Sequence, residues 1–381
     1  MEEISGKRKK RIYNRNTLIP TLVVQFNLSA GVLHSTIMQM TSLPKICCLA
    51  LLLSSTYLNA QVKWQNVDSL FGPLPKNFHV YKCTDSLDGK PFFGYYIQAK
   101  LKDKKLHFTT DTTLKRRYTP QQFYQKNNQP LLVVNGTFFS FETNQNLNLV
   151  VKNSKVVSYN VHSIAGRGKD TLTYRHPLGS AIGIDKKRRA DVAWVFTDSV
   201  FKRKSYAIQN TFNPPKDSFS FYKFSKANYY NSILYTSGIE HFLKKWKVTT
   251  AIGGGPVLLQ NAEIKITNNE ELKFSGKTGL TDKHPRTAMG YTANGYLIIM
   301  VVEGRNSGVA DGVTLPQLAK LFKEIGCVEA LNLDGGGSSC MLINGKETIR
   351  TSDKTGQRAV PAVFIIPVSY THLTLPTNRE V

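Results

Sequence analysis

The decapeptide Ala330–Ser339 (Ala-Leu-Asn-Leu-Asp-Gly-Gly-Gly-Ser-Ser) constrains the fold and function of this chain more than any other segment. An apolar run typical of a β-strand leads directly to one carboxylate, Asp334, and then to three glycines and two serines. Consecutive glycines let the backbone adopt positive φ and approach a ligand closely, at an entropic cost that a purely structural turn seldom bears. The segment therefore predicts a ligand-binding loop at a strand end. A tight turn capped by Asp334 is the structural alternative.

Two further polar segments lie upstream of this decapeptide. His284-Pro285-Arg286-Thr287 leads to an apolar run, residues 296–302, that predicts a β-strand. Glu303-Gly304-Arg305 follows that strand directly. Functional sites commonly assemble in loops at strand ends, so both segments are expected to contribute to a site.

A helix is expected between these segments and the decapeptide. Apolar residues within 315–325 fall on one helical face, Thr314 suits the N-cap, Pro316 suits the first turn and Gly326 suits the end. Residues 328–333 then predict a second strand, which delivers the carboxylate into its glycine loop.

Two more glycine-containing motifs follow apolar strands. Asn135-Gly136-Thr137-Phe138-Phe139 comes after residues 131–134, and Gly254-Gly255-Pro256 comes after residues 248–252. The first motif also matches an N-glycosylation sequon or a simple turn. The second is not a nucleotide-binding loop, because no Gly-Lys-Ser/Thr follows it.

Five of these motifs, in this order, resemble the family of phosphodiester glycosidases related to N-acetylglucosamine-1-phosphodiester α-N-acetylglucosaminidase. They are Asn135–Phe139, Gly254–Leu258, His284–Thr287, Glu303–Arg305 and Leu333–Ser339. Any one of them is a weak signal, whereas five in order, over roughly residues 131–361, are specific. The chain departs from the family pattern at Glu303, where Asp is frequent, and at Thr137, where a second Gly is frequent. These departures leave the class of enzyme intact and the substrate open.

The resemblance implies hydrolysis of the bond between a sugar's anomeric carbon and a phosphodiester. Because phosphate is a good leaving group, binding the phosphate and stabilising positive charge on the sugar should matter more than general-acid assistance. Asp334 and Glu303 are the catalytic candidates, one as nucleophile or charge stabiliser and the other as general base or acid. A salt bridge to a nearby arginine is the alternative role for each, and a divalent cation between them is less favoured.

Arginine suits phosphate because its planar guanidinium binds two oxygens at once. Arg286 and Arg305 are the predicted phosphate ligands, with Arg358 as a third, and a surface or salt-bridge role is the alternative. His284 is either a substrate ligand or a partner of the neighbouring loop. The remaining predicted substrate-binding residues offer amides or hydroxyls: Asn135, Thr137, Gly254, Gly255, Thr287, Gly335, Gly336, Ser338 and Ser339.

The charge of the chain points to an anionic partner. The formal net charge is +24; the first sixty residues carry seven Lys or Arg and two acids, so 43 basic and 24 acidic residues, a net +19, lie beyond them. Such an excess favours phosphodiesters, acidic polysaccharide, nucleic acid or a membrane surface. Nucleic acid is disfavoured, because no predicted helix has a basic face with interleaved aromatic residues.

Residues 1–60 are expected to comprise an N-terminal extension, residues 1–39, from an upstream start codon, and a targeting segment, residues 40–60, that is a secretory signal peptide. Met40–Lys45 gives a positive start, Ile46–Leu53 an apolar stretch and Ser54–Ala60 a cleavage region. The mature protein, beginning after Ala60, is therefore expected to be secreted or periplasmic, without a stable membrane span. A membrane anchor at residues 18–38 is the alternative, but polar residues interrupt it.

The predicted fold is α+β, a mixed, strand-rich sheet with a few packed helices and a single catalytic domain. Residues 61–129 are expected to form an N-terminal β-rich subdomain, residues 130–367 the catalytic domain and residues 368–381 an unstructured tail. Short helices are expected over 118–127 and 233–246. Cysteines 83, 327 and 340 lack the spacing of a zinc site and are expected to be buried free thiols, with one intrachain disulfide as the alternative. No metal or cofactor is predicted.

Two other functions fit parts of the pattern. The +19 charge suits a non-catalytic module that binds anionic surface polysaccharide. A hydrolase with Ser338 or Ser339 as nucleophile is a weaker alternative, because no Gly-x-Ser-x-Gly elbow is present.

Overall fold

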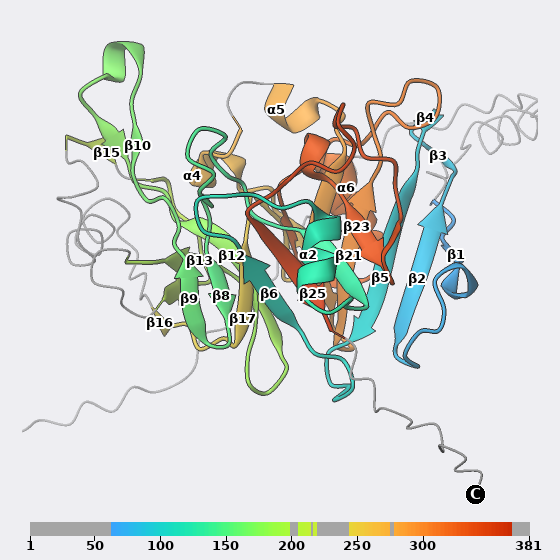
Figure 1. Cartoon of the computed structure of the whole chain (residues 1–381). Helices are drawn as coiled ribbons and strands as arrows, with labels where there is room; N and C mark the ends of the chain where they lie inside the picture. The colour runs from blue at the N-terminus through green and yellow to red at the C-terminus, as the bar shows by residue number, and fades with distance from the viewer. Residues whose placement is uncertain (1–61, 199–204, 215, 219–243, 275–277, 368–381) are drawn as a thin grey trace, which may run out of the picture. The chain divides into compact units, whose positions relative to one another are not determined.

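The computed structural model describes residues 62–198, 205–214, 216–218, 244–274 and 278–367 (Figure 1). The predicted targeting segment and the C-terminal tail lie outside the described residues. So do residues 233–243 of the helix expected over 233–246, while Lys244–Lys245 form strand β16. None of the helices in the described part of the chain is long and apolar enough to cross a membrane.

The site is built on a sheet of eight strands in the order β1-β2-β5-β21-β20-β22-β18-β19. Its strands are β1 Gln65–Asn66, β2 Phe78–Cys83, β5 Gly94–Lys100, β18 Val257–Gln260, β19 Glu263–Ile264, β20 Arg286–Thr292, β21 Tyr296–Val302 and β22 Cys327–Asn332. The predictions of strands over 296–302 and 328–333 are confirmed to within a residue.

The prediction of a mixed sheet is wrong, because every pairing among the described strands of this sheet is antiparallel. The strand–helix–strand order from β21 through helix α6, Leu315–Glu324, to β22 does place two strands in the same direction. They are not neighbours, however, since β20 lies between them and pairs with both. A tight turn over residues 293–295 joins β20 to β21 and makes these two strands neighbours, whereas β22 reaches the other side of β20 after helix α6.

Two further sheets complete the strand-rich α+β fold, which confirms the predicted class. The seven-stranded sheet contains, in order, β16, β14 Tyr206–Ile208, β13 Ala190–Phe196, β12 Gly179–Ile184, β17 Thr250–Gly253, β8 Val150–Lys152 and β9 Lys155–Ser158. The five-stranded sheet contains β24 Lys346–Glu347, β23 Met341–Ile343, β7 Leu132–Asn135, β25 Ala362–Ile366 and β6 Thr109–Thr112.

Short elements connect these sheets. The minor strands are β3 Ser86–Leu87, β4 Lys90–Pro91, β10 Ile164–Ala165, β11 Tyr174–Arg175 and β15 Lys216–Asp217. The short helices are α2 Pro120–Lys126, α4 Asn268–Glu271 and α5 Thr278–Thr281, with 3₁₀ turns η1 Asp68–Leu70, η2 Gly168–Asp170 and η4 Gly336–Ser338. Helix α2 confirms the short helix expected over 118–127.

Helix α6 begins as its sequence predicts. The Thr314 hydroxyl accepts a hydrogen bond from the Gln317 N–H, and the Gln317 side chain accepts one from the Thr314 N–H, which completes a capping box. The helix ends at Gly326, whose φ of +89° is readily adopted only by glycine. Its apolar face, including Leu318 and Phe322, packs on the eight-stranded sheet.

The opposite face of the eight-stranded sheet forms the main core. Ile97 and Ile299 from this sheet pack with Trp194 of the seven-stranded sheet and Phe364 of the five-stranded sheet. The predicted N-terminal subdomain contributes strands to two sheets: β5 pairs with β21 in the eight-stranded sheet, and β6 pairs with β25 in the five-stranded sheet. The three described cysteines are buried free thiols, as predicted.

Candidate active site

Three strand pairings bring four of the motifs to one edge of the eight-stranded sheet, and a backbone hydrogen bond links the fifth motif, after β7 of the five-stranded sheet, to the same edge. Because β20 is antiparallel to both neighbours, its first residue, Arg286, lies opposite the last residue of β21, Val302, and Ala288, two residues further on, lies opposite the last residue of β22, Asn332. The Leu333 N–H donates to the Thr287 carbonyl (2.8 Å), and the Asp334 N–H donates to the carbonyl of Gly136, directly after β7 (2.9 Å). Strand β18, which follows the Gly-Gly-Pro motif, pairs with β22 at the same edge. Segments far apart in the sequence therefore meet around Asp334.

Asp334 is half-buried at the end of β22 and has an unusual proton affinity. Burial raises the pKa of its carboxyl to about 7, against smaller opposing effects of the Ser338 hydroxyl, the Arg358 charge and the Gly335 N–H. Ser338 is itself buried, and its hydroxyl oxygen has no hydrogen-bond partner of good geometry within the described residues. A carboxyl whose pKa is raised towards neutrality, with a buried hydroxyl beside it, is typical of a functional site.

Two guanidinium groups lie against the glycine loop that follows Asp334. A β-carbon at Gly336 would lie 3.2 Å from Arg305 Nη2, and one at Gly337 would lie 2.2 Å from Arg358 Nη2. A side chain at Gly337 would therefore displace the Arg358 guanidinium, and one at Gly336 would be strained by its φ of +60° and would press on Arg305. Arg358 also forms an ion pair with Asp353 (2.6 Å), whereas Arg305 is exposed.

Arg286 and His284 complete the cationic cluster. Arg286 is 3% exposed and donates to the carbonyls of Val313 and Asp282, both at 3.2 Å. Burial, aided by the Arg305 charge, lowers the pKa of Arg286 to about 10, so the group stays cationic at neutral pH. Within the described part of the chain, neither Arg286 nor Arg305 forms an ion pair with a carboxylate. The Asp282 charge acts on Arg286 in the opposite direction, and two neighbouring cations without an ion-paired carboxylate are suited to binding an anion.

His284 is expected to be neutral at this site. Burial lowers its pKa, and the charges of Arg286 and Arg305 lower it further. Its Nδ1 lies 3.4 Å from Arg305 Nη2, so the neutral ring can accept a weak hydrogen bond and orient that guanidinium. The structure thus supports the second of the two roles considered for His284, a partner of the adjacent loop.

Asn135 fixes the position of the Asp334 loop through hydrogen bonds to its backbone and its neighbours. Its Nδ2 donates to the Asp334 carbonyl (2.6 Å), and its Oδ1 accepts from the Thr287 hydroxyl (2.8 Å) and the Cys340 N–H (3.1 Å). The Thr287 and Ser339 hydroxyls lie 3.2 Å apart. All these side chains are buried, so the arrangement supports positioning of the loop rather than direct contact with a sugar.

Replacing Asn135 with Ala is expected to lower the free energy of unfolding by about 2–4 kcal/mol. The change leaves the Thr287 hydroxyl, the Cys340 N–H and the Asp334 carbonyl without their partners in a buried site. Urea unfolding followed by circular dichroism measures the effect. Gln145→Ala, at an exposed amide, is the control and should change stability by less than about 0.5 kcal/mol. Equal stabilities for the two variants would contradict this role.

The other polar residues predicted to face the sugar also bond to protein groups. Thr137 is buried and donates to Asn146 Oδ1. The Gly254 N–H donates to the Ser180 carbonyl (3.0 Å) and the Gly255 N–H to the Asn332 carbonyl (2.7 Å), so neither amide is available to a ligand. Their place in the structure supports a packing role at the end of β22.

Glu303 is 4% exposed and both of its carboxylate oxygens accept hydrogen bonds. Asn306 Nδ2 donates to Oε1 (2.8 Å) and the Arg350 N–H donates to Oε2 (3.0 Å). Glu303 thereby joins the loop that carries Arg305 to the loop that carries Arg350. A pocket of about 400 Å³ lies between these two loops, with Ser352 and Lys354 on its wall.

Sequence reasoning missed the aromatic and lysine side chains around the cationic cluster. Phe274 packs edge-on against Phe138 and lies 5.7 Å from the Arg286 guanidinium. Phe141 lies 5.4 Å from the Arg358 guanidinium. Burial lowers the pKa of Lys273, whose side chain packs against Gly255. The segment with Lys273 and Phe274 contains no motif, so no sequence pattern selects these residues. Of these side chains, only Phe138 could have been found, because it lies inside the first motif.

Among the described residues, no group of three or more His, Cys, Asp or Glu side chains has the geometry of a metal site. The two sequence-predicted acids do not share a ligand position, because Glu303 is occupied by its own loop partners.

The structure thus combines a strand-rich α+β fold with a carboxyl of raised pKa, Asp334, and a cluster of arginines beside its glycine loop. Residues 128–367 match the family model described as phosphodiester glycosidase, and the chain belongs to this family. The family prediction made from the five motifs is thus confirmed.

Individual relatives support the same assignment over shorter regions. The chain is 30% identical over 103 residues to bovine (Bos taurus) N-acetylglucosamine-1-phosphodiester alpha-N-acetylglucosaminidase, covering 25% of this chain and 19% of that protein. It is 41% identical over 107 residues to the SPbeta prophage-derived uncharacterized protein YomE of Bacillus subtilis (strain 168), covering 28% and 16%. The matches thus span less than a fifth of these relatives' length.

Two solved structures share the fold. The catalytic domain of zebrafish N-acetylglucosamine-1-phosphodiester alpha-N-acetylglucosaminidase superposes with a TM-score of 0.50 and 19% identity, covering 81% of this chain and 88% of that one. A hypothetical protein from Synechocystis gives a TM-score of 0.52 with 14% identity, covering 80% and 64%.

Proposed function

We propose that this protein hydrolyses the bond between a sugar's anomeric carbon and a phosphodiester. One observation carries the proposal: two guanidinium groups without an ion-paired carboxylate among the described residues, Arg286 and Arg305, converge beside a carboxyl whose pKa is raised to about 7. Glycosidase chemistry needs a carboxylate at the anomeric carbon, and a phosphodiester leaving group needs cations. Family membership and the fold agree with both requirements.

The residues divide into two roles. Arg305, with Arg286 and Arg358, binds the phosphate oxygens and stabilises the negative charge that grows as the C–O bond breaks. The electron pair of that bond leaves with the phosphate oxygen. Ionised Asp334 stabilises the positive charge on the anomeric carbon or attacks it directly. Water supplies the hydroxyl group of the released sugar, and its other proton passes to the released phosphate or to solvent. Glu303 positions Arg305 and Arg350 through its two hydrogen bonds.

The pocket beside Arg305 gives the phosphodiester's second substituent a place to bind. Arg350 and Lys354 on its walls add positive charge, while the one acidic lining residue, Asp353, is paired with Arg358. This arrangement suits a substituent that is itself polar or anionic, as in a glycan or an exopolysaccharide.

Replacing Arg358 with Met is expected to move the low-pH limb of the hydrolysis profile to higher pH. The Arg358 charge lowers the pKa of Asp334, so its loss should raise that pKa and reduce the ionised fraction at pH 7. On this limb, where Asp334 is mostly protonated, each tenfold drop in its acidity constant should lower activity about tenfold. The pH profile of kcat/KM measures the effect. An unchanged low-pH limb would show that Asp334 does not control it.

The function is tested by assaying the purified protein with UDP-N-acetylglucosamine and with synthetic sugar-1-phosphodiesters. Release of the free sugar by the wild type, and its loss in Asp334→Asn, are expected. No hydrolysis of any of these substrates, or equal hydrolysis by both forms, would contradict the proposal.

A non-catalytic module for anionic surface polysaccharide remains the second candidate, because the same arginines and the net +19 charge would bind such a polymer. This candidate and the proposed hydrolase predict different results. A binding module would show no hydrolysis in the wild type, and its salt-dependent binding of the polymer would persist in Asp334→Asn and Glu303→Gln. A serine nucleophile finds less support, because Ser338 and Ser339 are both buried.

We also propose that the protein acts outside the cytoplasm, after cleavage near Ala60. The expected positive, apolar and cleavage regions within residues 40–60 support this. N-terminal sequencing of the protein recovered from the periplasm or medium would give a start near Gln61, and an intact start in the cell pellet would contradict it.

A further inference from the structure

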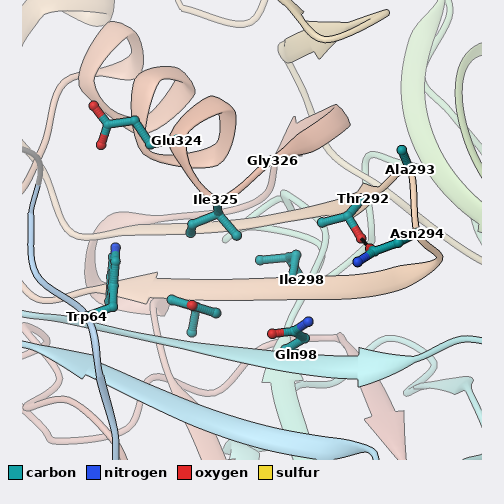
Figure 2. Close-up of a pocket in the computed structure, with 10 residues that line it drawn as sticks. Trp64, Gln98, Thr292, Ala293, Asn294, Ile298, Glu324, Ile325 and Gly326 are labelled. Carbon is teal, nitrogen blue, oxygen red and sulfur yellow. Dashed lines mark hydrogen bonds between the residues drawn. The ribbon is translucent and has the colours of Figure 1, made fainter.

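A second pocket, of about 450 Å³, lies at the other end of strand β20 from the candidate active site (Figure 2). Arg286 and Thr292, the two ends of β20, are six residues apart and therefore lie on the same face of the sheet. Helix α6 packs on this face, beginning near Arg286, which donates to the Val313 carbonyl, and ending at the second pocket with Glu324. The strand rise places the two sites about 20 Å apart.

One end of this pocket is an aromatic wall. Trp64 is half-buried and contacts Tyr96 (4.7 Å between ring centroids) and Phe92 (5.9 Å), both in edge-to-face geometry. Tyr96 in turn stacks on Tyr81 at 4.6 Å. The Trp64 ring is therefore held by three further aromatic rings while part of it remains accessible, which gives a ligand a preformed apolar surface at little entropic cost.

The other end of the pocket is polar and uncharged. Figure 2 shows Gln98, Thr292 and Asn294 grouped across Ile298 from Trp64. The Thr292 hydroxyl donates to Asn294 Oδ1, which fixes the orientation of this amide and leaves its NH₂ group available. No hydrogen bond joins the Gln98 side chain to another group among the described residues. Two amides and an aromatic ring are the groups that bind hydroxyl-rich, uncharged ligands.

The charge of this pocket sets it apart from the candidate active site. The chain carries a net +24, yet none of the residues that line this pocket is Lys or Arg. Its one charged lining residue is Glu324, whose carboxylate lies 3.8 Å from Lys320 Nζ. The nearest cations are already engaged, since Lys100 Nζ donates to the Asn294 carbonyl (2.7 Å) and Lys320 pairs with Glu324, whereas the hydroxyls of a neutral sugar would find donors and acceptors.

We infer that this pocket is a binding site for a neutral saccharide, separate from the site around Asp334. Its volume falls in the range of small-molecule sites and suits one or two sugar units. The saccharide packs a ring face on Trp64, and its hydroxyls bond to the Gln98 and Asn294 amides, whereas the Glu324 carboxylate points away from these side chains (Figure 2). Such a site would hold a carbohydrate polymer on the protein independently of hydrolysis.

The test measures binding of neutral oligosaccharides, cellohexaose and N-acetylchitohexaose, to the purified full-length protein by calorimetry. Wild type is expected to bind at least one of them. Trp64→Ala is expected to weaken that binding at least tenfold, and Gln98→Leu, which keeps the size of the side chain, at least fivefold. Gln145→Leu is the matched control, because Gln145 is an exposed amide that does not line this pocket, and this variant should bind as tightly as wild type.

A second readout separates this site from the proposed hydrolysis. Hydrolysis of a small sugar-1-phosphodiester should stay within twofold of wild type in Trp64→Ala and Gln98→Leu, so each proposal can fail without the other. Absence of neutral-oligosaccharide binding by the wild type, or equal binding by wild type and both variants, would overturn the inference. Binding that depends on Trp64 but is confined to anionic oligosaccharides would overturn it as well.

Discussion

Asp334→Asn is expected to lower kcat/KM for sugar-1-phosphodiester hydrolysis by about 10³-fold or more. Asparagine has nearly the same shape, but it can neither stabilise positive charge on the anomeric carbon nor attack it, and a carboxylate in this role contributes at least this factor. The loop should keep its shape, because the bonds to Gly136 and Asn135 use the backbone of residue 334. Steady-state kinetics of the two forms measure the loss.

The stability of Asp334→Asn provides the control for this experiment. Burial raises the pKa of Asp334 in the folded protein above the ordinary value of 3.8, to about 7. Stability from the protonated carboxyl is therefore present below about pH 4 and is lost as the pH rises through about 7. Asparagine is uncharged and avoids the cost of burying an ionised carboxylate at pH 8. The free energy of unfolding of the variant at pH 8 should therefore equal that of wild type or exceed it, by at most about 4 kcal/mol. A variant that is less stable than wild type at pH 8 would point to a folding defect instead.

Arg305→Gln is expected to lower kcat/KM by about 10- to 100-fold. The change removes a cation that has no carboxylate partner among the described residues and lies against the loop of Asp334. Charge-assisted hydrogen bonds to a phosphate are worth about 1.5–3 kcal/mol, which corresponds to this range. The loss should be smaller for a substrate with an uncharged leaving group.

Arg189→Gln is the matched control for Arg305→Gln. Its guanidinium is 67% exposed and pairs with Asp185 in the turn before β13, away from the site. Loss of one positive charge at this position should leave kcat/KM within twofold of wild type. Equal losses in the two variants would show that net charge, rather than a specific phosphate contact, determines the rate.

The strands and the main helix could be predicted from the sequence because their signals are local. The apolar run of β21, bounded by Gly295 and Glu303, and the Thr314 cap of α6 each depend on neighbouring residues. The convergence of the motifs could also be predicted, since strand ends that carry polar residues tend to share an edge of a sheet. The position of β20 between β21 and β22 could not be predicted, because the order of strands in a sheet depends on contacts between distant segments.

The division of labour among polar residues could not be predicted, because burial decides it. Asn135 and Thr287 appear in motifs and were expected to face a substrate, but their side chains bond to each other beneath the loop. Glu303 likewise is bonded to its own loops. Conversely, Lys273 reaches the site from a segment without a motif. Composition and order identify such residues as important, and only three-dimensional packing shows whether they contact a ligand or hold a group that does.

The most direct test is a crystal structure of Asp334→Asn with an intact sugar-1-phosphodiester bound. The anomeric carbon should lie about 3–3.5 Å from the side chain of residue 334, a distance from which attack is possible. The phosphate should lie about 3 Å from the Arg305 guanidinium and from that of Arg286 or Arg358. A phosphate bound on another surface, with the glycine loop vacant, would contradict the account.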